Sequence, residues 1–255
     1  MSQKARAVVV VPIYKPELDH YEFFALKNSL RILAARDVGF AAPRGLDLAF
    51  YADNFPGAGF TRFDDEYFAS IDGYNRLMTS RAFYEAFAPS HEFMLLLQPD
   101  ALVFRDDLDD WMQRGVDYVG APWPDFVMVG LPGESPRFPG QRLAVGVGNG
   151  GLSLRRIGAC LDALGSFDWV LGVVPMPEDV FFSVVGQLSA GFRIPGQAAA
   201  ARFAVEFRPL AFLESAEHSP MGFHAWRKFG RDVCPRWMRM AGYRNVTPVR
   251  RAPGA

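Results

Sequence analysis

The segment "ARAVVVVPIY" (residues 5–14) is the strongest indicator of fold class in this chain. It is a continuous, mostly β-branched run closed by a proline, which is typical of a central strand buried on both faces. The next segment, "YEFFALKNSLRILAAR" (residues 21–36), carries apolar residues at helical spacing. A strand followed directly by a helix predicts an α/β layer fold.

The same alternation continues along the chain. We predict strands at residues 46–54, 92–98 and 116–122, and helices at residues 74–89 and 108–115. Residues 124–146 are rich in Pro and Gly and predict a long loop, and residues 157–167 predict a helix. We therefore expect one α/β domain over residues 1–226 and a basic extension over residues 227–255.

Composition limits the function classes. The chain has 255 residues, 50% hydrophobic residues and a formal net charge of −1, so it can form a large core and has no overall field that attracts nucleic acid. Its two cysteines lie far apart, without metal-ligand spacing, which favours a reducing compartment. With no apolar run near the roughly 18 residues of a spanning helix, we expect a cytoplasmic, soluble protein.

The C-terminal part is locally basic. From Arg227 to the end there are eight Lys or Arg residues and one acid, Asp232. Mixed with Trp, Phe and Met, these cations suit peripheral contact with anionic lipid at the inner face of a membrane. The alternative is a solvated terminus, which Pro235 and Gly242 favour because they interrupt any long helix.

A carboxylate follows the hydrophobic strand expected at residues 92–98. In "HEFMLLLQPDALVF" (residues 91–104), Asp100 stands between two apolar runs, where an acidic side chain is costly to bury without a partner. Because open α/β sheets bind ligands at the carboxyl ends of their strands, Asp100 is a candidate ligand of Mg²⁺ or Mn²⁺ beside a diphosphate. The alternative is a turn aspartate, and spacing alone leaves both open.

Three later motifs carry further candidates. "GVGNGGLSLRR" has four glycines in residues 146–151, which allow close backbone approach to a ligand or make a plain turn. "PMPEDVFF" puts Glu178 and Asp179 at a helix start, where one carboxylate stabilises the helix and a second can act as a general base. "PMGFHAW" contains His224, which is either a core histidine or a metal ligand.

These motifs, together with "GYNRLMTSRAFYEAF" and "WMQRGVDYVGAPW", occur in a recognisable order. From about residue 8 to residue 226 the chain closely resembles a bacterial and fungal domain-of-unknown-function family regarded as GT-A type glycosyltransferases. The resemblance implies a Rossmann-like, mixed but mostly parallel sheet flanked by helices. It also implies a nucleotide-diphospho-sugar donor, a glycan or lipid-linked acceptor, and hexosyl transfer assisted by Mn²⁺ or Mg²⁺.

A looser similarity to the metal-dependent, inverting β-1,3-glycosyltransferase and fringe-like enzymes implies individual roles. Asp100 corresponds to the last aspartate of their Asp-x-Asp motif, His224 to the late metal ligand and Asp179, next to Glu178, to the general base. Gln98 stands where an aspartate is expected, which removes one carboxylate from the site. A non-catalytic carbohydrate- or nucleotide-sugar-binding protein on the same fold is therefore the alternative function.

The donor site is expected to draw on several segments. Tyr14, after Pro12, can stack on the nucleotide base, and Trp123 can form a platform for a sugar ring, although either aromatic can equally be a core residue. Asn75 can cap a helix, while Arg76 can meet the diphosphate. The complete set of expected donor-binding residues is Pro12, Tyr14, Arg76, Gln98, Asp100, Trp123, Gly148, Asn149, Gly150 and Gly151.

Overall fold

The fold is a three-layer α/β arrangement around one six-stranded sheet. The computed structural model describes residues 5–213 and 219–244. The strands of the main sheet lie in the order β3-β2-β1-β4-β9-β6. Their bounds are β1 (Ala5–Pro12), β2 (Asp37–Pro43), β3 (Gly59–Phe63), β4 (His91–Leu97), β6 (Tyr118–Val119) and β9 (Leu152–Arg156). β1 pairs in parallel with β2 and β4, and β2 with β3, whereas β9 runs antiparallel to both β4 and β6.

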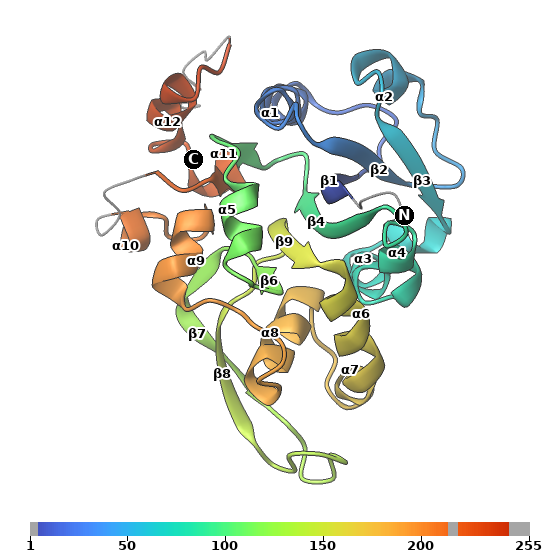
Figure 1. Cartoon of the computed structure of the whole chain (residues 1–255), viewed down its shortest axis with the longest axis vertical. Helices are drawn as coiled ribbons and strands as arrows, with labels where there is room; N and C mark the ends of the chain where they lie inside the picture. Colours follow the sequence, from blue (N-terminus) through green and yellow to red (C-terminus); the bar gives the residue numbers. More distant parts are fainter. Residues whose placement is uncertain (1–4, 214–218, 245–255) are drawn as a thin grey trace, which may run out of the picture.

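The valine run of β1 is explained by burial on both faces. Val9 and Val11 belong to the core beneath α1 and α2, whereas Val8 and Val10 belong to the core beneath α3, α4, α6 and α8. These helices cover the two faces of the sheet (Figure 1). Their bounds are α1 (His20–Ile32), α2 (Ala49–Asn54), α3 (Ile71–Met78), α4 (Arg81–Glu85), α6 (Ile157–Ser166) and α8 (Glu178–Leu188). The predicted central strand and α/β layers are confirmed.

Two smaller sheets complete the strand structure. One has the order β10-β11-β5, with bounds β10 (Ala204–Val205), β11 (Gly222–Phe223) and β5 (Leu102–Val103). The other is the hairpin of β7 (Pro122–Gly130) and β8 (Arg142–Val147), which projects from the body along its long axis (Figure 1). The remaining helical segments are η1 (Asp65–Phe68), α5 (Leu108–Gln113), α7 (Asp168–Val173), α9 (Gln197–Phe203), α10 (Leu210–Leu213), α11 (Trp226–Phe229) and α12 (Cys234–Met240).

Several predictions of secondary structure were wrong. The strand expected at residues 46–54 is not formed: residues 49–54 form the helix α2, and the strand β2 lies earlier, at residues 37–43. The long loop expected at residues 124–146 is mostly the β7–β8 hairpin, because Val129, Leu143 and Val145 are buried against the core although Pro and Gly surround them. The expected single helix at residues 74–89 is divided into α3 and α4, since the Ser80 hydroxyl accepts a hydrogen bond from Phe83 N and starts a new helix.

The C-terminal segment packs against α1. Tyr243 is buried, and its hydroxyl donates to the backbone oxygen of Val103 at 2.8 Å and lies 3.2 Å from Ser29 Oγ. Cys234 and Met238 of α12 are also buried. The expected solvated terminus is therefore wrong as far as residue 244, while Arg250 and Arg251 lie outside the described residues. No helix among residues 5–213 and 219–244 is long and apolar enough to cross a membrane.

Candidate functional site

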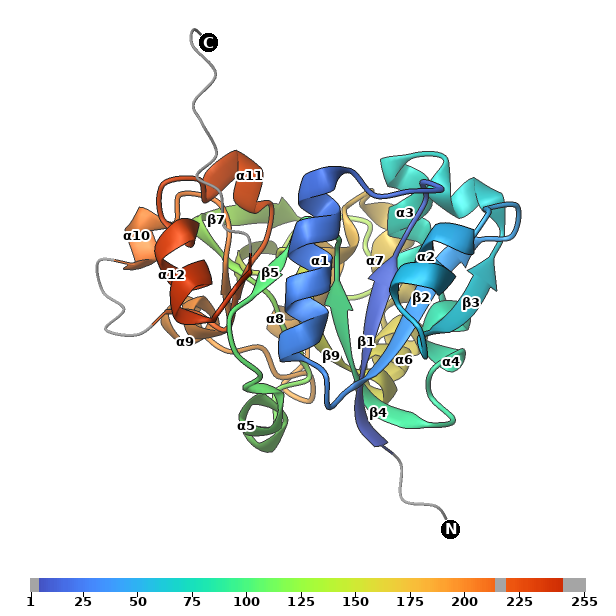
Figure 2. The same cartoon turned by 90° about the horizontal axis from the view of Figure 1, so that it is seen from above.

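The candidate site lies at the edge of the main sheet where β1 and β4 end, with α11 along the same edge (Figure 2). β9 runs antiparallel to β4, so the loop before β9 returns to this edge. The backbone N–H of Gln98 donates to the carbonyl of Gly151 at 2.8 Å, which holds the glycine loop against the end of β4. The glycine motif and the acidic strand end, predicted separately from the sequence, therefore lie side by side.

The small sheet brings the next residues together through its strand register. β11 pairs antiparallel with β5 and parallel with β10, with Phe223 opposite Leu102 and Val205. One residue further along, His224 reaches Asp100 on one side and Glu206 on the other. His224 Nε2 lies 3.3 Å from Asp100 Oδ1, and His224 Nδ1 lies 2.7 Å from Glu206 Oε2.

The charges of this cluster are coupled. Burial lowers the pKa of His224, but hydrogen bonds to Asp100 and Glu206 outweigh burial and raise that pKa to about 10. Burial also acts to raise the pKa of Asp100, but its hydrogen bond to His224 dominates and leaves the pKa below its ordinary value. Both shifts favour a protonated His224 beside an ionised Asp100.

The glycine loop is tightly packed by protein side chains. A Cβ atom on Gly151 would lie 2.1 Å from His224 Nε2, and one on Gly150 would lie 2.1 Å from Glu178 Oε1. A Cβ on Gly148 would lie 2.0 Å from the indole of Trp123. The absence of side chains at these positions therefore makes room for His224, Glu178 and Trp123, a reason that the sequence motif alone did not indicate.

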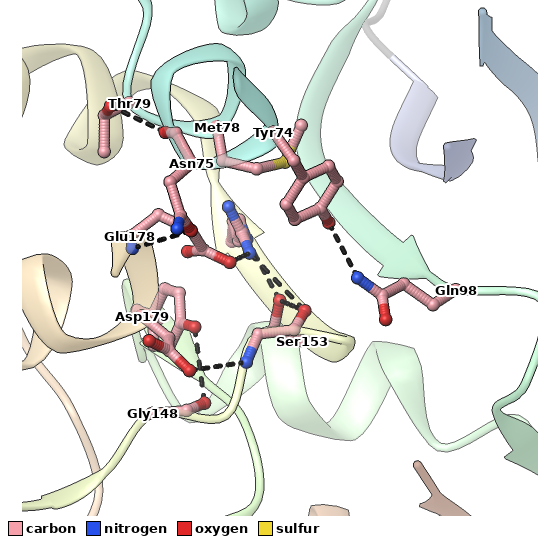
Figure 3. A network of polar contacts seen from close by, with 12 residues as sticks. Tyr74, Asn75, Met78, Thr79, Gln98, Gly148, Ser153, Glu178 and Asp179 are labelled. Atoms are coloured by element: carbon pink, nitrogen blue, oxygen red, sulfur yellow. Dashed lines mark hydrogen bonds and ion pairs between the residues drawn. The ribbon is translucent and has the colours of Figure 1, made fainter. Parts of the chain in front are cut away.

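Glu178 forms a buried ion pair at the start of α8. Its Oε1 accepts from Arg155 Nη2 at 3.1 Å, and both side chains are at most 5% exposed. Arg155 also donates to the hydroxyls of Tyr84 and Ser153. Figure 3 shows Glu178 and Ser153 in the same polar network. Burial raises the pKa of the Glu178 carboxyl to about 7 against the opposing effect of Arg155. Glu178 Oε2 has no hydrogen-bond partner among the described residues.

Asp179 is held differently from its neighbour. Its carboxylate accepts from Val180 N at 2.8 Å and, more weakly, from Gly150 N at 3.4 Å. Burial raises the pKa of Asp179 above its ordinary value. The two adjacent carboxylates thus occupy distinct environments, one paired with an arginine and the other with backbone amides (Figure 3).

A cavity of about 590 Å³ connects these groups. It is lined by ten of the residues expected from the sequence, namely Pro12, Tyr14, Gln98, Asp100, Asn149, Gly150, Gly151, Glu178, Asp179 and His224. Tyr14 is 59% exposed, so it is no core residue. Three expected donor-binding residues do not line the cavity: Arg76 is exposed on α3, whereas Gly148 and Trp123 pack against each other.

Residues at the site also include some that sequence reasoning missed. Glu206 and Lys15 lie outside the quoted motifs, and Arg155 lies within the glycine motif but was not singled out. The tertiary structure brings all three to the site. Asn75 was expected as a helix cap, but Ser70 caps α3, and Asn75 Oδ1 instead accepts from Glu178 N at 3.3 Å. Asn75 therefore fixes the start of α8 rather than the start of its own helix.

The side chains around Asp100 offer possible ligands for a divalent cation. No group of three or more His, Cys, Asp or Glu side chains within residues 5–213 and 219–244 is arranged to hold a metal. However, His224 Nε2 lies 2.9 Å from Gln98 Oε1 and 3.3 Å from Asp100 Oδ1. Neighbouring ligands in an octahedral shell with bonds of about 2.1 Å are about 3 Å apart. This mixed set of donors therefore fits Mg²⁺ or Mn²⁺, provided that other oxygens complete the shell.

Solved structures establish the fold class. The chain matches mouse xyloside xylosyltransferase 1 with a TM-score of 0.54 at 13% identity, covering 86% of this chain and 97% of that chain. It matches the galactosyltransferase LgtC with a TM-score of 0.52 at 16% identity, over 95% and 98% of the two chains. It also matches core-mannan synthase A from Aspergillus fumigatus in its Mn/GDP form, with a TM-score of 0.52 at 10% identity over 72% and 70%. The fold is that of the GT-A glycosyltransferases.

A sequence-family model identifies the family of this chain. Residues 57–224 match the family described as "Protein of unknown function (DUF5672)", and the chain belongs to this family. No curated protein matches the chain. The matched range contains Asp100, the glycine loop, the Glu178–Asp179 pair and, as its last residue, His224.

Proposed function

We propose that this protein transfers a hexosyl group from a nucleotide-diphospho-sugar to a hydroxyl of a glycan or lipid-linked acceptor. The observation that carries the proposal is the cavity at the carboxyl ends of β1 and β4, which gathers Asp100, His224, Glu178 and Asp179 on a GT-A fold. Ligands of open α/β sheets bind in this position. The looser similarity to inverting β-1,3-glycosyltransferase and fringe-like enzymes supports the roles assigned below.

The donor nucleotide would enter beside the end of β1. The exposed ring of Tyr14 can stack on the base, next to Pro12. The ammonium group of Lys15 lies 2.8 Å from Glu22 Oε1 and is 40% exposed, so it can also attract the diphosphate. These contacts suit a charged, flat ligand.

Asp100 and His224 would hold the Mn²⁺ or Mg²⁺ ion. A bound divalent ion would offset the negative charge that develops on the departing nucleoside diphosphate. Asp100 provides the negatively charged ligand, and the buried setting of His224 fixes the direction of its ring. The core-mannan synthase structure was obtained with Mn and GDP, which supports this proposal by analogy of fold.

Asp179 would act as the general base. The acceptor oxygen bonds to the anomeric carbon, the bond from that carbon to the diphosphate oxygen breaks, and the hydroxyl proton moves to Asp179. The raised pKa of Asp179 makes it a better proton acceptor than an exposed aspartate. Direct attack inverts the anomeric configuration. Glu178, the neighbouring residue expected in catalysis, lines the cavity and is paired with Arg155.

A second candidate function is a non-catalytic protein that binds a carbohydrate or nucleotide-sugar. Gln98 in place of an aspartate favours this alternative because it leaves the cation site with a single protein carboxylate. A nucleotide-sugar-binding protein would differ from the enzyme in turnover alone, whereas a carbohydrate-binding protein would not require a sugar nucleotide.

The deciding experiment is isothermal titration of nucleoside diphosphates and sugar nucleotides, with and without Mn²⁺. We expect one nucleotide class to bind, more weakly without metal, and at least about tenfold more weakly to Asp100→Ala. Asp162→Ala, which removes an exposed aspartate on α6, is the matched control and should bind like the wild type. Failure of every sugar nucleotide to bind would refute the proposal. If one sugar nucleotide binds, its hydrolysis or the transfer of its sugar would distinguish an enzyme from a binding protein.

A further inference from the structure

Gln98 stands where an aspartate is expected from the similarity to metal-dependent fringe-like enzymes. Its side chain is oriented by a second residue, Tyr74. Its side-chain Nε2 donates to the hydroxyl of Tyr74 at 3.0 Å, while its Oε1 lies 2.9 Å from His224 Nε2. An amide has one donor end and one acceptor end, so the bond to Tyr74 turns the oxygen toward His224. Figure 3 shows the amide nitrogen directed at Tyr74 and the oxygen facing away from it.

His224 is oriented in the same manner from the opposite side. Glu206 Oε2 accepts from Nδ1 at 2.7 Å, and both side chains are 12% exposed. Metal-bound histidines commonly use their second nitrogen in such a bond, which fixes the ring and makes the ligand nitrogen more basic. Nε2 is thereby left to face Gln98 Oε1 and Asp100 Oδ1.

We propose that the amide oxygen of Gln98 is the third protein ligand of a divalent cation, beside Asp100 and His224, and that Tyr74 and Glu206 are its positioning residues. The inference rests on the proposed function only in assuming that the cavity holds such an ion. Carbonyl oxygens are suitable ligands for Mg²⁺ and Mn²⁺.

This ligand set has a consequence for affinity. Asp100 is the one negatively charged group among the three ligands, so the bound ion keeps a net positive charge that a diphosphate can neutralise. Since fewer charged ligands mean weaker binding, Mn²⁺ alone should bind weakly and should bind more tightly when a nucleoside diphosphate is present. Restoring a carboxylate at position 98 should strengthen binding of Mn²⁺ alone.

The test is Mn²⁺ binding to the full chain, measured from the loss of the free-ion signal in electron paramagnetic resonance, without nucleotide. We expect Gln98→Ala to weaken binding about tenfold or more and Gln98→Asp to strengthen it by a similar factor. Tyr74→Phe and Glu206→Gln should weaken it about 10- to 100-fold. Tyr67→Phe and Glu66→Gln make the same chemical changes on η1, outside the ligand set. These matched controls should leave Mn²⁺ binding unchanged.

The outcomes separate this inference from the proposed function. If Asp100→Ala abolishes binding while both Gln98 variants bind Mn²⁺ like the wild type, Gln98 is no ligand and the inference is wrong, although the proposed function stands. If the wild type binds no Mn²⁺ at millimolar concentration, with or without a nucleoside diphosphate, the cation site itself is refuted. The proposed function is then tested independently by calorimetric titration with sugar nucleotides. The gain expected for Gln98→Asp cannot arise from misfolding.

Discussion

His224 is a single residue whose charge links stability to pH. Its pKa is raised to about 10 in the folded protein by Asp100 and Glu206, against 6.5 for an ordinary histidine. Between these two values the folded chain binds a proton that the unfolded chain releases. The stabilisation is therefore complete below about pH 6.5 and is lost as the pH rises toward 10.

We expect the free energy of unfolding, measured by urea titration in EDTA, to fall between pH 6.5 and 9.5. The contribution of His224 to this slope is at most about 1.4 kcal/mol per pH unit. His224→Gln should flatten the slope, whereas His91→Gln, which changes a histidine whose Nε2 lies 3.0 Å from Asp37 Oδ2, should retain it. Parallel profiles for the wild type and His224→Gln would show that the cluster does not hold an imidazolium.

Residue chemistry was only partly predictable from the sequence. Asp100, Asp179 and His224 could be singled out because acidic and imidazole side chains beside apolar runs are uncommon and chemically useful. Glu206 could not, because its partner is 18 residues away and the two meet only through the register of β10 with β11. Arg76 was chosen for its charge, but its side chain is exposed on α3 and does not line the cavity.

At the scale of elements, the glycines of the loop before β9 leave room for the side chains that pack against them. Gly151 lies beside His224, whereas a Cβ on Gly158 of α6 would meet no atom within 4 Å among the described residues outside its own helix and its chain neighbours. The two glycines therefore form a matched pair, one in a crowded position and the other in an open one.

We expect Gly151→Ala to destabilise the fold by about 1–3 kcal/mol because the new methyl group must displace His224. It should also abolish Mn²⁺ binding. Gly158→Ala should instead raise the free energy of unfolding by up to about 1 kcal/mol, since alanine favours the helix, and leave ligand binding intact. Urea titration and calorimetry on both variants check this, and equal behaviour of the two would contradict the packing described.

Helices and strands were predicted correctly where the hydrophobic pattern was strong and no Pro or Gly content indicated a loop. β1, β4 and α6 were predicted because long apolar runs or helical spacing leave few alternatives. The β7–β8 hairpin was missed because its Pro and Gly content predicts a loop, while its burial against α8 and the core is a long-range effect. The strand expected at residues 46–54 was wrong because short apolar stretches fit both the strand and the helix period.

At the scale of the whole molecule, the site and the basic C-terminal segment are neighbours. α11 begins two residues after His224, and the backbone N–H of Trp226 lies 3.4 Å from the carbonyl of Asp100. On α12, Arg236 and Arg239 are exposed beside Met240, which is 71% exposed. Cations next to an exposed apolar side chain suit the surface of an anionic membrane.

We expect the full chain to sediment with vesicles of phosphatidylglycerol and phosphatidylcholine at low salt, but not with phosphatidylcholine alone. Each cation near such a surface contributes about 1 kcal/mol, so Arg236→Glu with Arg239→Glu should weaken partitioning by about 30-fold or more. Arg137→Glu with Arg142→Glu makes the same charge change near the β7–β8 hairpin and should have little effect. Equal sedimentation of both double variants would refute lipid contact through α12.

The sequence by itself determined the fold class and the chemical types present at the site. Hydrophobic periodicity is local, so it specifies the central strand, its first helix and the apolar runs that carry Asp100 and Glu178. The tertiary structure decided which of these groups meet. Strand register in the small sheet places His224 between Asp100 and Glu206, and the antiparallel return of β9 places Arg155 under Glu178. Such contacts join residues far apart in the chain, and their geometry depends on packing that no local pattern encodes.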